Sequence, residues 1–207
     1  VAWDEWNTYA WDFEKDADDT RFTLKNAILT AGILHSFIRS SDIVEIASYS
    51  PFVNVCGAIS VKKDHVLRRA QYSVFELLSK VFAACDCYVE TRMESEQFEL
   101  PEVIDYSNRM AEAKFALDAK SEKRMVKTSY IDCVAAMNED GTKMAVSLIN
   151  KNLDKDYEVE LSVPGSNAVW DQALCYQIYH PDFNASNTSK EPENVIAKEV
   201  KDILKAG

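Results

Sequence analysis

Helical spacing of apolar residues stands out early in the chain. Apolar side chains recur three and four positions apart, at Leu24, Ala27, Ile28, Ala31, Leu34, Phe37 and Ile38. This stripe is typical of an amphipathic helix with one buried face. Asp18, Asp19 and Thr20 are candidate N-caps, and the polar run at residues 40–42 ends the pattern. We therefore expect a helix over residues 21–39.

Two short apolar runs flank this helix and read as strands. Residues 1–3 form one run and residues 43–49 the other. A strand, a helix and a second strand in this order are typical of a parallel β/α unit. Two parallel strands cannot cover a core, so residues 1–50 are expected either to belong to a larger domain or to pack against the residues that follow. We therefore expect the chain to be a piece of a longer protein.

A basic stretch and a second helical pattern follow. Residues 61–69 are rich in Lys and Arg, and we interpret them as an exposed connection. Apolar pairs then fall at positions 74/75, 77/78 and 81/82. This spacing predicts a helix over residues 73–82.

From residue 85 onward the pattern becomes that of β-strands. Apolar and polar residues alternate, or form short apolar runs, at residues 85–91, 129–137, 143–150, 157–163 and 168–180. Residues 138–142 have the composition of a hairpin turn. Residues 105–128 are charged and lack Gly and Pro, and we expect a helix or a mobile insertion there. Residues 200–207 are expected to form a short helix or tail.

These patterns predict a mainly β fold in three parts. Residues 1–62 form the β/α segment and residues 63–84 a connection with a helix. Residues 85–207 form an antiparallel β-sandwich that carries the charged insertion near residues 105–128.

Composition narrows the classes of partner. The 34 acidic and 23 basic residues give a net charge of −11, which disfavours nucleic acid as a partner. No apolar run has the length of a membrane helix, so we expect no membrane partner.

The five cysteines and three histidines lack the spacing of metal ligands, so we expect reduced core cysteines, no metal and no cofactor. Cys85 and Cys87 would share one strand face, which leaves open a redox pair or half of a metal site. His35, His65 and His180 are expected to be structural or solvated.

The first residues carry the candidate chemistry. Asp4 and Glu5 stand between Trp3 and Trp6, directly after the first predicted strand. One interpretation is a strand end that delivers an acid into a pocket, and the other is a junction whose acids face water. Aromatic and acidic residues interleave over residues 7–13, as in a loop that contacts sugars or in a partly buried surface loop.

Several blocks, in order along the chain, resemble the C-terminal part of α-L-arabinofuranosidases of glycoside hydrolase family 51. The first is Trp-Asp-Glu-Trp-Asn at residues 3–7, followed by residues 31–42 and 52–55. Residues 75–80 and 185–193 look like later blocks of that family. In that family a (β/α)8 barrel precedes a C-terminal jelly-roll-like β-domain. The resemblance implies that residues 1–62 are the last part of the barrel and residues 85–207 the jelly-roll-like β-sandwich.

The resemblance also implies a chemistry. It makes Glu5 the nucleophile of a retaining glycoside hydrolase and Trp6, Asn7 and Tyr9 substrate-binding residues. The implied substrates are L-arabinofuranosyl units of arabinose-containing oligosaccharides or polysaccharides, within L-arabinose metabolism. The family's acid/base lies in a Gly-Asn-Glu motif that this sequence lacks, and Glu139 is expected to be a solvated turn residue. The chain alone is therefore expected to be inactive.

Two positions depart from the family pattern, and two other functions stay open. Thr8 stands where the family usually has Trp, and Pro51 where Gln is common, so the preferred arabinoside is open. One alternative is a non-catalytic carbohydrate-binding sandwich. Its candidate sugar-contacting residues are Trp170, Tyr176 and Tyr179, for which packing in the core is the competing role. The other is a purely structural, oligomer-forming sandwich. We expect a homo-oligomer and a cytoplasmic location.

Overall fold

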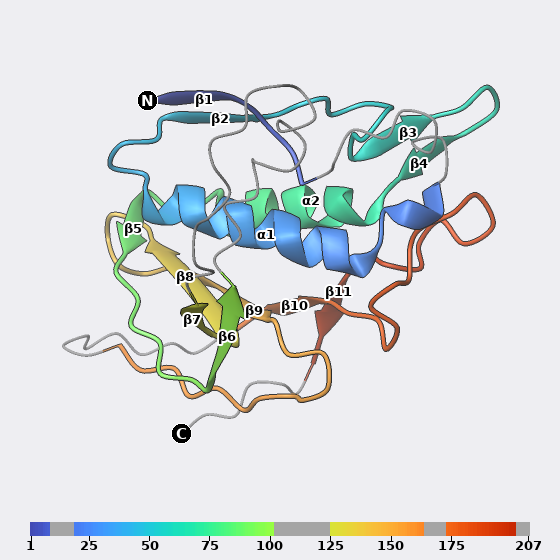
Figure 1. Cartoon of the computed structure of the whole chain (residues 1–207). Coiled ribbons are helices and arrows are strands. Elements are labelled where there is room, and N and C mark those ends of the chain that lie inside the picture. The colour runs from blue at the N-terminus through green and yellow to red at the C-terminus, as the bar shows by residue number, and fades with distance from the viewer. Residues whose placement is uncertain (9–18, 102–124, 164–172, 202–207) are drawn as a thin grey trace, which may run out of the picture.

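The computed structural model describes residues 1–8, 19–101, 125–163 and 173–201. Within these ranges most elements are strands, so the predicted mainly β content is confirmed. Figure 1 shows two helices between a pair of strands from the start of the chain and the strands of its second half. The helices α1 (Leu24–Arg39) and α2 (Ala70–Phe82) pack against each other. Among the described residues, neither helix is long and apolar enough to cross a membrane.

The predicted β/α unit is present at the start of the chain. Strand β1 (Ala2–Trp6) pairs in parallel with β2 (Ile46–Tyr49), and α1 connects them. Parallel strands need such a crossover, because a tight hairpin can join only antiparallel strands. Both predicted strands and the helix between them are therefore confirmed.

Helix α1 begins later than the sequence pattern suggested. A short 3-10 helix, η1 (Asp19–Arg21), comes first, and Thr23 is the N-cap. The Thr23 N–H donates to Asn26 Oδ1 at 3.0 Å, which satisfies one N–H group at the helix start. The prediction of a cap at residues 18–20 was wrong for Asp19, because its carboxylate binds Arg69 instead. Asp18 lies outside the described residues.

The basic stretch at residues 61–69 is largely exposed, as predicted, but it forms a strand pair and contains two buried residues. Strands β3 (Ile59–Val61) and β4 (Val66–Arg68) form an antiparallel hairpin that leads into α2. Leu67 and Arg69 are each 1% exposed. Arg69 Nη1 donates to the carbonyls of Val55 and Gly57, both at 2.8 Å. The prediction of exposure was therefore wrong at Leu67 and Arg69 alone, and these acceptors satisfy the buried guanidinium.

The second half of the chain is antiparallel. The strands β5 (Cys87–Val89), β8 (Ile131–Met137) and β9 (Met144–Asn150) form one sheet in that order. The predicted hairpin through residues 138–142 joins β8 to β9 and is confirmed. Two further antiparallel pairs join β6 (Gln97–Pro101) to β7 (Met125–Ser129) and β10 (Cys175–Ile178) to β11 (Ala197–Val200).

Three predictions in this half were wrong at particular residues. Residues 157–163 form no strand, because their alternating pattern meets no partner strand in the described part of the chain. Residues 125–128 belong to β7 rather than to an insertion, because they pair with β6. Val200 ends β11 instead of starting a tail. The other predictions for residues 105–124 and 202–207 lie outside the described residues.

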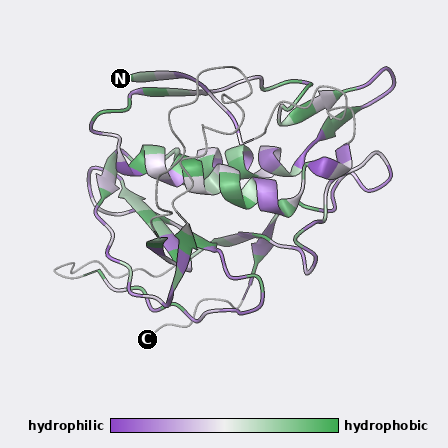
Figure 2. Ribbon diagram, in the orientation of Figure 1, coloured by the Kyte–Doolittle hydropathy of each residue, from purple (hydrophilic) through white to green (hydrophobic). Residues whose placement is uncertain are grey.

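The core lies along the two helices. One cluster joins α1 and α2 to the C-terminal part of the chain, through Leu24, Ala27, Ala70, Val74, Ala185 and Val195. A second cluster holds Trp6, Tyr49 and Ala58 against the opposite side of the helices. Figure 2 shows hydrophobic residues along both helices, between the two groups of strands.

Candidate active site at the end of strand β1

Strand β1 departs from regular pairing at its two acidic residues. Trp3 pairs with Ala47 and Trp6 with Tyr49, so β1 uses one residue more than β2 over this interval. The register shift therefore falls on Asp4 and Glu5. Such irregularities often lie beside active sites, where they redirect a side chain.

The residue after this irregularity, Trp6, fixes the end of β1 in the core. Its side chain is 8% exposed and makes T-shaped contacts with Phe37 (5.4 Å) and Tyr49 (5.0 Å) between ring centroids. Phe75 of α2 lies 6.0 Å away. The indole Nε1 is buried and has no hydrogen-bond partner within the described part of the chain. Trp6 thus holds the strand end firmly behind Glu5.

Glu5 itself is exposed, and a hydroxyl orients it. The Ser50 hydroxyl donates to Glu5 Oε1 at 3.3 Å. The Ser50 N–H also donates to the Trp6 carbonyl at 3.0 Å. Asn7 Nδ2 donates to the carbonyls of Ser50 (3.1 Å) and Cys56 (3.4 Å). These contacts join the end of β1 to the loop after β2.

That loop has a strained backbone. Asn54 and Val55 have positive φ values of 58° and 45°. A β-branched residue such as Val rarely adopts this conformation, and such strain often occurs at functional sites. The loop is held in place because Arg69 binds the Val55 carbonyl and the Val61 N–H donates to Asn54 Oδ1 at 2.7 Å.

Tyr49 lies beneath the loop as a neutral hydrogen-bond donor. Burial, together with the nearby Cys56 thiol, raises the pKa of Tyr49 to about 12. Its hydroxyl donates to the Cys56 carbonyl at 3.4 Å. A phenol with so high a pKa stays protonated near neutral pH and does not serve as a base there.

The structure describes three of the four predicted site residues. Glu5, Trp6 and Asn7 adjoin one another at the end of β1, whereas Tyr9 lies outside the described residues. Trp6 is largely enclosed, so a sugar would reach little of its ring. The sequence patterns missed Ser50, because a serine before a proline carries no signal of a contact with Glu5.

Glu139 lies in another part of the fold, as predicted. It is exposed in the turn between β8 and β9, and its N–H donates to Asp86 Oδ2 at 3.1 Å. The described residues hold no group of three or more metal-ligating side chains. The five cysteines, all described, form no disulfide. Cys56 and Cys133 are buried as predicted, whereas Cys85 and Cys175 are partly buried and Cys87 is exposed.

The arrangement offers two exposed carboxylates, those of Asp4 and Glu5, near the C-terminal end of a parallel strand. Barrel enzymes place catalytic groups at such strand ends. In the described part of the chain, Ser50 is the hydrogen-bond partner of the Glu5 carboxylate. Retaining glycoside hydrolysis needs a second carboxyl group about 5–5.5 Å from the nucleophile.

Comparisons with known proteins show the family of the chain. The family model for the α-L-arabinofuranosidase C-terminal domain matches residues 4–207. A probable α-L-arabinofuranosidase C from Aspergillus clavatus is 27% identical over 164 residues, which cover 76% of this chain and 28% of the relative.

Solved structures show the same similarity. The thermostable GH51 α-L-arabinofuranosidase from Thermotoga petrophila has a TM-score of 0.74 and 27% identity. The α-L-arabinofuranosidase from Thermotoga maritima, in its arabinose complex, has a TM-score of 0.72 and 26% identity. In both cases the match covers 96% of this chain and 38% of the other, so the chain spans well under half the length of these relatives. The chain belongs to the α-L-arabinofuranosidase C-terminal domain family.

Proposed function

We propose that this chain is the C-terminal part of a retaining α-L-arabinofuranosidase of glycoside hydrolase family 51, with Glu5 as its nucleophile. The observation that carries the proposal is the exposed Glu5 carboxylate at the irregular end of parallel strand β1, in a chain that the family model matches. We further propose that β1, α1 and β2 are the last part of a (β/α)8 barrel. The strands from β5 onward then belong to a jelly-roll-like β-domain.

Exposed apolar residues around β1 and β2 support the barrel. Val1 is 70% exposed, Trp3 52%, and Ile43 and Ile46 are each 58% exposed. Large apolar side chains left exposed on neighbouring strands usually mark a contact with other protein. Further barrel strands and helices would cover this surface.

The proposed chemistry removes L-arabinofuranosyl units from arabinose-containing oligosaccharides or polysaccharides. Glu5 attacks the anomeric carbon while a second carboxylic acid protonates the departing oxygen. The resulting carboxylate then deprotonates a water molecule, which attacks the anomeric carbon and releases Glu5. The Ser50 hydroxyl holds one oxygen of Glu5, leaving the other for the attack. Trp6, Asn7 and Tyr9 are proposed to contact the sugar or to shape its site.

A chimeric enzyme tests the role of Glu5. In it, this chain replaces the matching C-terminal region of the Thermotoga petrophila enzyme, and turnover of an aryl α-L-arabinofuranoside is measured. We expect Glu5→Gln to lower kcat by about a thousandfold or more, because an amide is a poor nucleophile. The 207-residue chain alone is expected to show no turnover, because one carboxylate cannot act as both nucleophile and acid.

Glu45→Gln is the matched control. Glu45 is also exposed and directly precedes β2, where its N–H donates to the Val1 carbonyl at 3.0 Å. The substitution therefore removes the same charge from the other end of the strand pair, away from Glu5. This variant should keep the activity of the parent chimera. Equal losses in the two variants, or turnover by the isolated chain above its Glu5→Gln variant, would refute the proposal.

A second candidate is a non-catalytic carbohydrate-binding sandwich. Three partly exposed rings stack in a row, with 4.5 Å between the centroids of Phe98 and Tyr130 and 6.1 Å between those of Tyr130 and Tyr157. Aromatic faces are a common surface for sugar rings. Saturable binding of arabinan that Phe98→Ala abolishes would favour this function over a purely catalytic one.

A further inference from the structure

A pocket of about 320 Å³ lies on the side of the helices where β7 and β8 lie (Figure 1). It opens between the C-terminal turn of α1 and the strands β7 and β8. Its lining includes three cationic side chains, from Arg39, Lys127 and Lys151, and the hydroxyl residues Thr91, Thr128 and Ser129. It shares no residue with the cluster around Glu5. Its volume falls at the small end of the range for ligand pockets.

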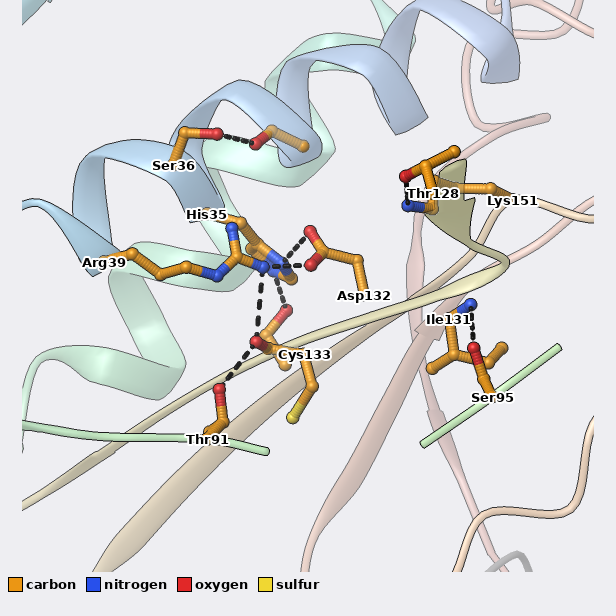
Figure 3. A network of polar contacts seen from close by, with 12 residues as sticks. His35, Ser36, Arg39, Thr91, Ser95, Thr128, Ile131, Asp132, Cys133 and Lys151 are labelled. Carbon is orange, nitrogen blue, oxygen red and sulfur yellow. Dashed lines mark hydrogen bonds and ion pairs between the residues drawn. The ribbon is translucent and has the colours of Figure 1, made fainter. Parts of the chain in front are cut away.

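The charge of this pocket is opposite to that of the whole chain. Three cations line it against the single carboxylate of Asp132, although the net charge of the chain is −11. That carboxylate is already engaged, since it accepts hydrogen bonds from Arg39 Nη2 and, at 3.1 Å, from His35 Nδ1 (Figure 3). A local excess of positive charge in a small concave site attracts anions.

Arg39 keeps donor groups for a ligand. Its Nη2 binds Asp132 Oδ1 and the Cys133 carbonyl, the latter at 3.4 Å. Its Nε and Nη1 have no hydrogen-bond partner among the described residues, and the side chain is 34% exposed. A guanidinium has five N–H donors, so the contact with Asp132 does not exhaust its capacity.

Lys151 is a partly buried ammonium that forms no ion pair with a carboxylate among the described residues. Its Nζ donates to Thr128 Oγ1 at 3.5 Å (Figure 3), and no described carboxylate lies within 4.0 Å of it. Burial lowers the pKa of Lys151, and the charge of Arg39 adds to this effect against the opposing charge of Asp132. A partly buried cation that lacks a partner is unfavourable, and a bound anion would offset the cost.

We propose that this pocket binds a small oxyanion, through Lys151, Arg39 and the neighbouring hydroxyl groups. Carboxylate and phosphate groups share the required chemistry, since both accept several charge-assisted hydrogen bonds. A sugar carboxylate and inorganic phosphate are the two sources to be distinguished. The site is separate from the proposed catalytic site at Glu5, and this proposal does not depend on the role of Glu5.

Calorimetric titration of the 207-residue chain tests the site, with inorganic phosphate and glucuronate as probes and glucose as the neutral control. We expect saturable binding of at least one of the two anions and none of glucose. Lys151→Gln should weaken that binding about tenfold or more, because it removes a charge-assisted hydrogen bond. Lys127 is more exposed, so Lys127→Gln should weaken the anion binding to a smaller extent. This second variant tests the site if Lys151→Gln does not fold.

Lys143→Gln is the matched control, because Lys143 is exposed in the β8–β9 turn and the variant changes the net charge equally. Its affinity should equal that of the parent chain. Phosphate binding alone assigns the pocket to phosphate groups, and glucuronate binding alone assigns it to sugar carboxylates. The proposal is overturned if neither anion shows saturable binding. It is also overturned if Lys151→Gln, Lys127→Gln and Lys143→Gln all reduce the affinity equally.

Discussion

At the scale of single residues, Asp132 fastens the helices to the sheet of the second half. It lies on β8 and binds both His35 and Arg39 of α1 (Figure 3). His35 is fully buried, and its Nε2 lies 2.8 Å from Ser147 Oγ on β9. In the neutral imidazole, Nδ1 donates to the carboxylate and Nε2 accepts from the hydroxyl. One buried ring thus links three elements.

Replacement of Asp132 by Asn should destabilise the fold by about 2 kcal/mol at neutral pH. The Arg39 guanidinium and the His35 imidazole would each lose a charged hydrogen-bond acceptor. Burial opposes ionisation of Asp132, but the hydrogen bond from His35 and the charge of Arg39 outweigh it and lower its pKa. The native state therefore binds fewer protons than the unfolded state just below the ordinary Asp pKa of about 3.9. The stabilisation is complete above that pH and is lost as the pH falls through the lowered pKa.

Urea unfolding of both proteins between neutral and acidic pH measures this effect. The difference in unfolding free energy between parent and Asp132→Asn should shrink below about pH 3.9. Asp154→Asn, at an exposed position in the loop after β9, should behave like the parent at every pH. Equal stability of parent and Asp132→Asn at neutral pH, or a difference that grows on acidification, would contradict this role.

The sequence revealed little at this scale. Asp132 lies 97 residues from His35 and 93 from Arg39, and no local pattern reports contacts over such separations. Glu5 was singled out because it stands between two tryptophans at a strand end and because the family resemblance assigned it a role. Ser50, its partner, had no such signal.

At the scale of elements, two glycine positions differ in whether they can accommodate a side chain. A Cβ on Gly57 would lie 2.5 Å from both the C and the O of the Phe52 backbone, so only glycine fits there. A Cβ on Gly32, inside α1, would meet nothing within 4 Å. The first glycine is required by the loop after β2, whereas the second only weakens a helix.

Gly57→Ala should therefore destabilise the protein by about 2 kcal/mol or more, because backbone atoms cannot move aside easily. Gly32→Ala should stabilise it by about 0.5–1 kcal/mol, since alanine favours the helix. Thermal and urea unfolding of both variants measure the two effects. A stable Gly57→Ala protein would mean that the loop adopts another conformation than the one described.

Elements with local signals were predictable, and those that depend on distant partners were not. The spacing of apolar residues gave both helices, and turn residues at 138–142 gave the β8–β9 hairpin. The start of α1 was misplaced because Asp19 binds Arg69 rather than capping the helix. Residues 157–163 alternate like a strand, but a strand also needs a neighbour to pair with.

At the scale of the whole molecule, the surface around β1 and β2 should make the chain self-associate. Ile43 and Ile46 are each 58% exposed there, and Trp3 is 52% exposed. Sedimentation velocity should show mass increasing with concentration, and Ile46→Ser should reduce this increase because it removes apolar surface. Leu174→Ser is the control, because Leu174 is 74% exposed outside this surface. A clean monomer at high concentration would contradict the prediction.

The mainly β character and the parallel unit were predictable at this scale because each follows from runs of adjacent residues. The packing of the helices between the two groups of strands was not, because it depends on contacts such as those of Trp6 with Phe37 and Phe75. These contacts hold Trp6 in the core and leave the neighbouring Glu5 at the surface. The proposed function therefore rests on a position that the folded chain creates.

The most direct test is to trap the sugar on its nucleophile. The chimera is incubated with a fluorinated arabinofuranoside whose glycosyl-enzyme intermediate hydrolyses slowly, and its peptides are then weighed by mass spectrometry. A retaining mechanism forms a covalent intermediate on one carboxylate. We predict that the added arabinosyl mass lies on the peptide that contains Glu5 and is absent from the Glu5→Gln variant. The same added mass on another carboxylate, with Glu5 unmodified, would contradict the account.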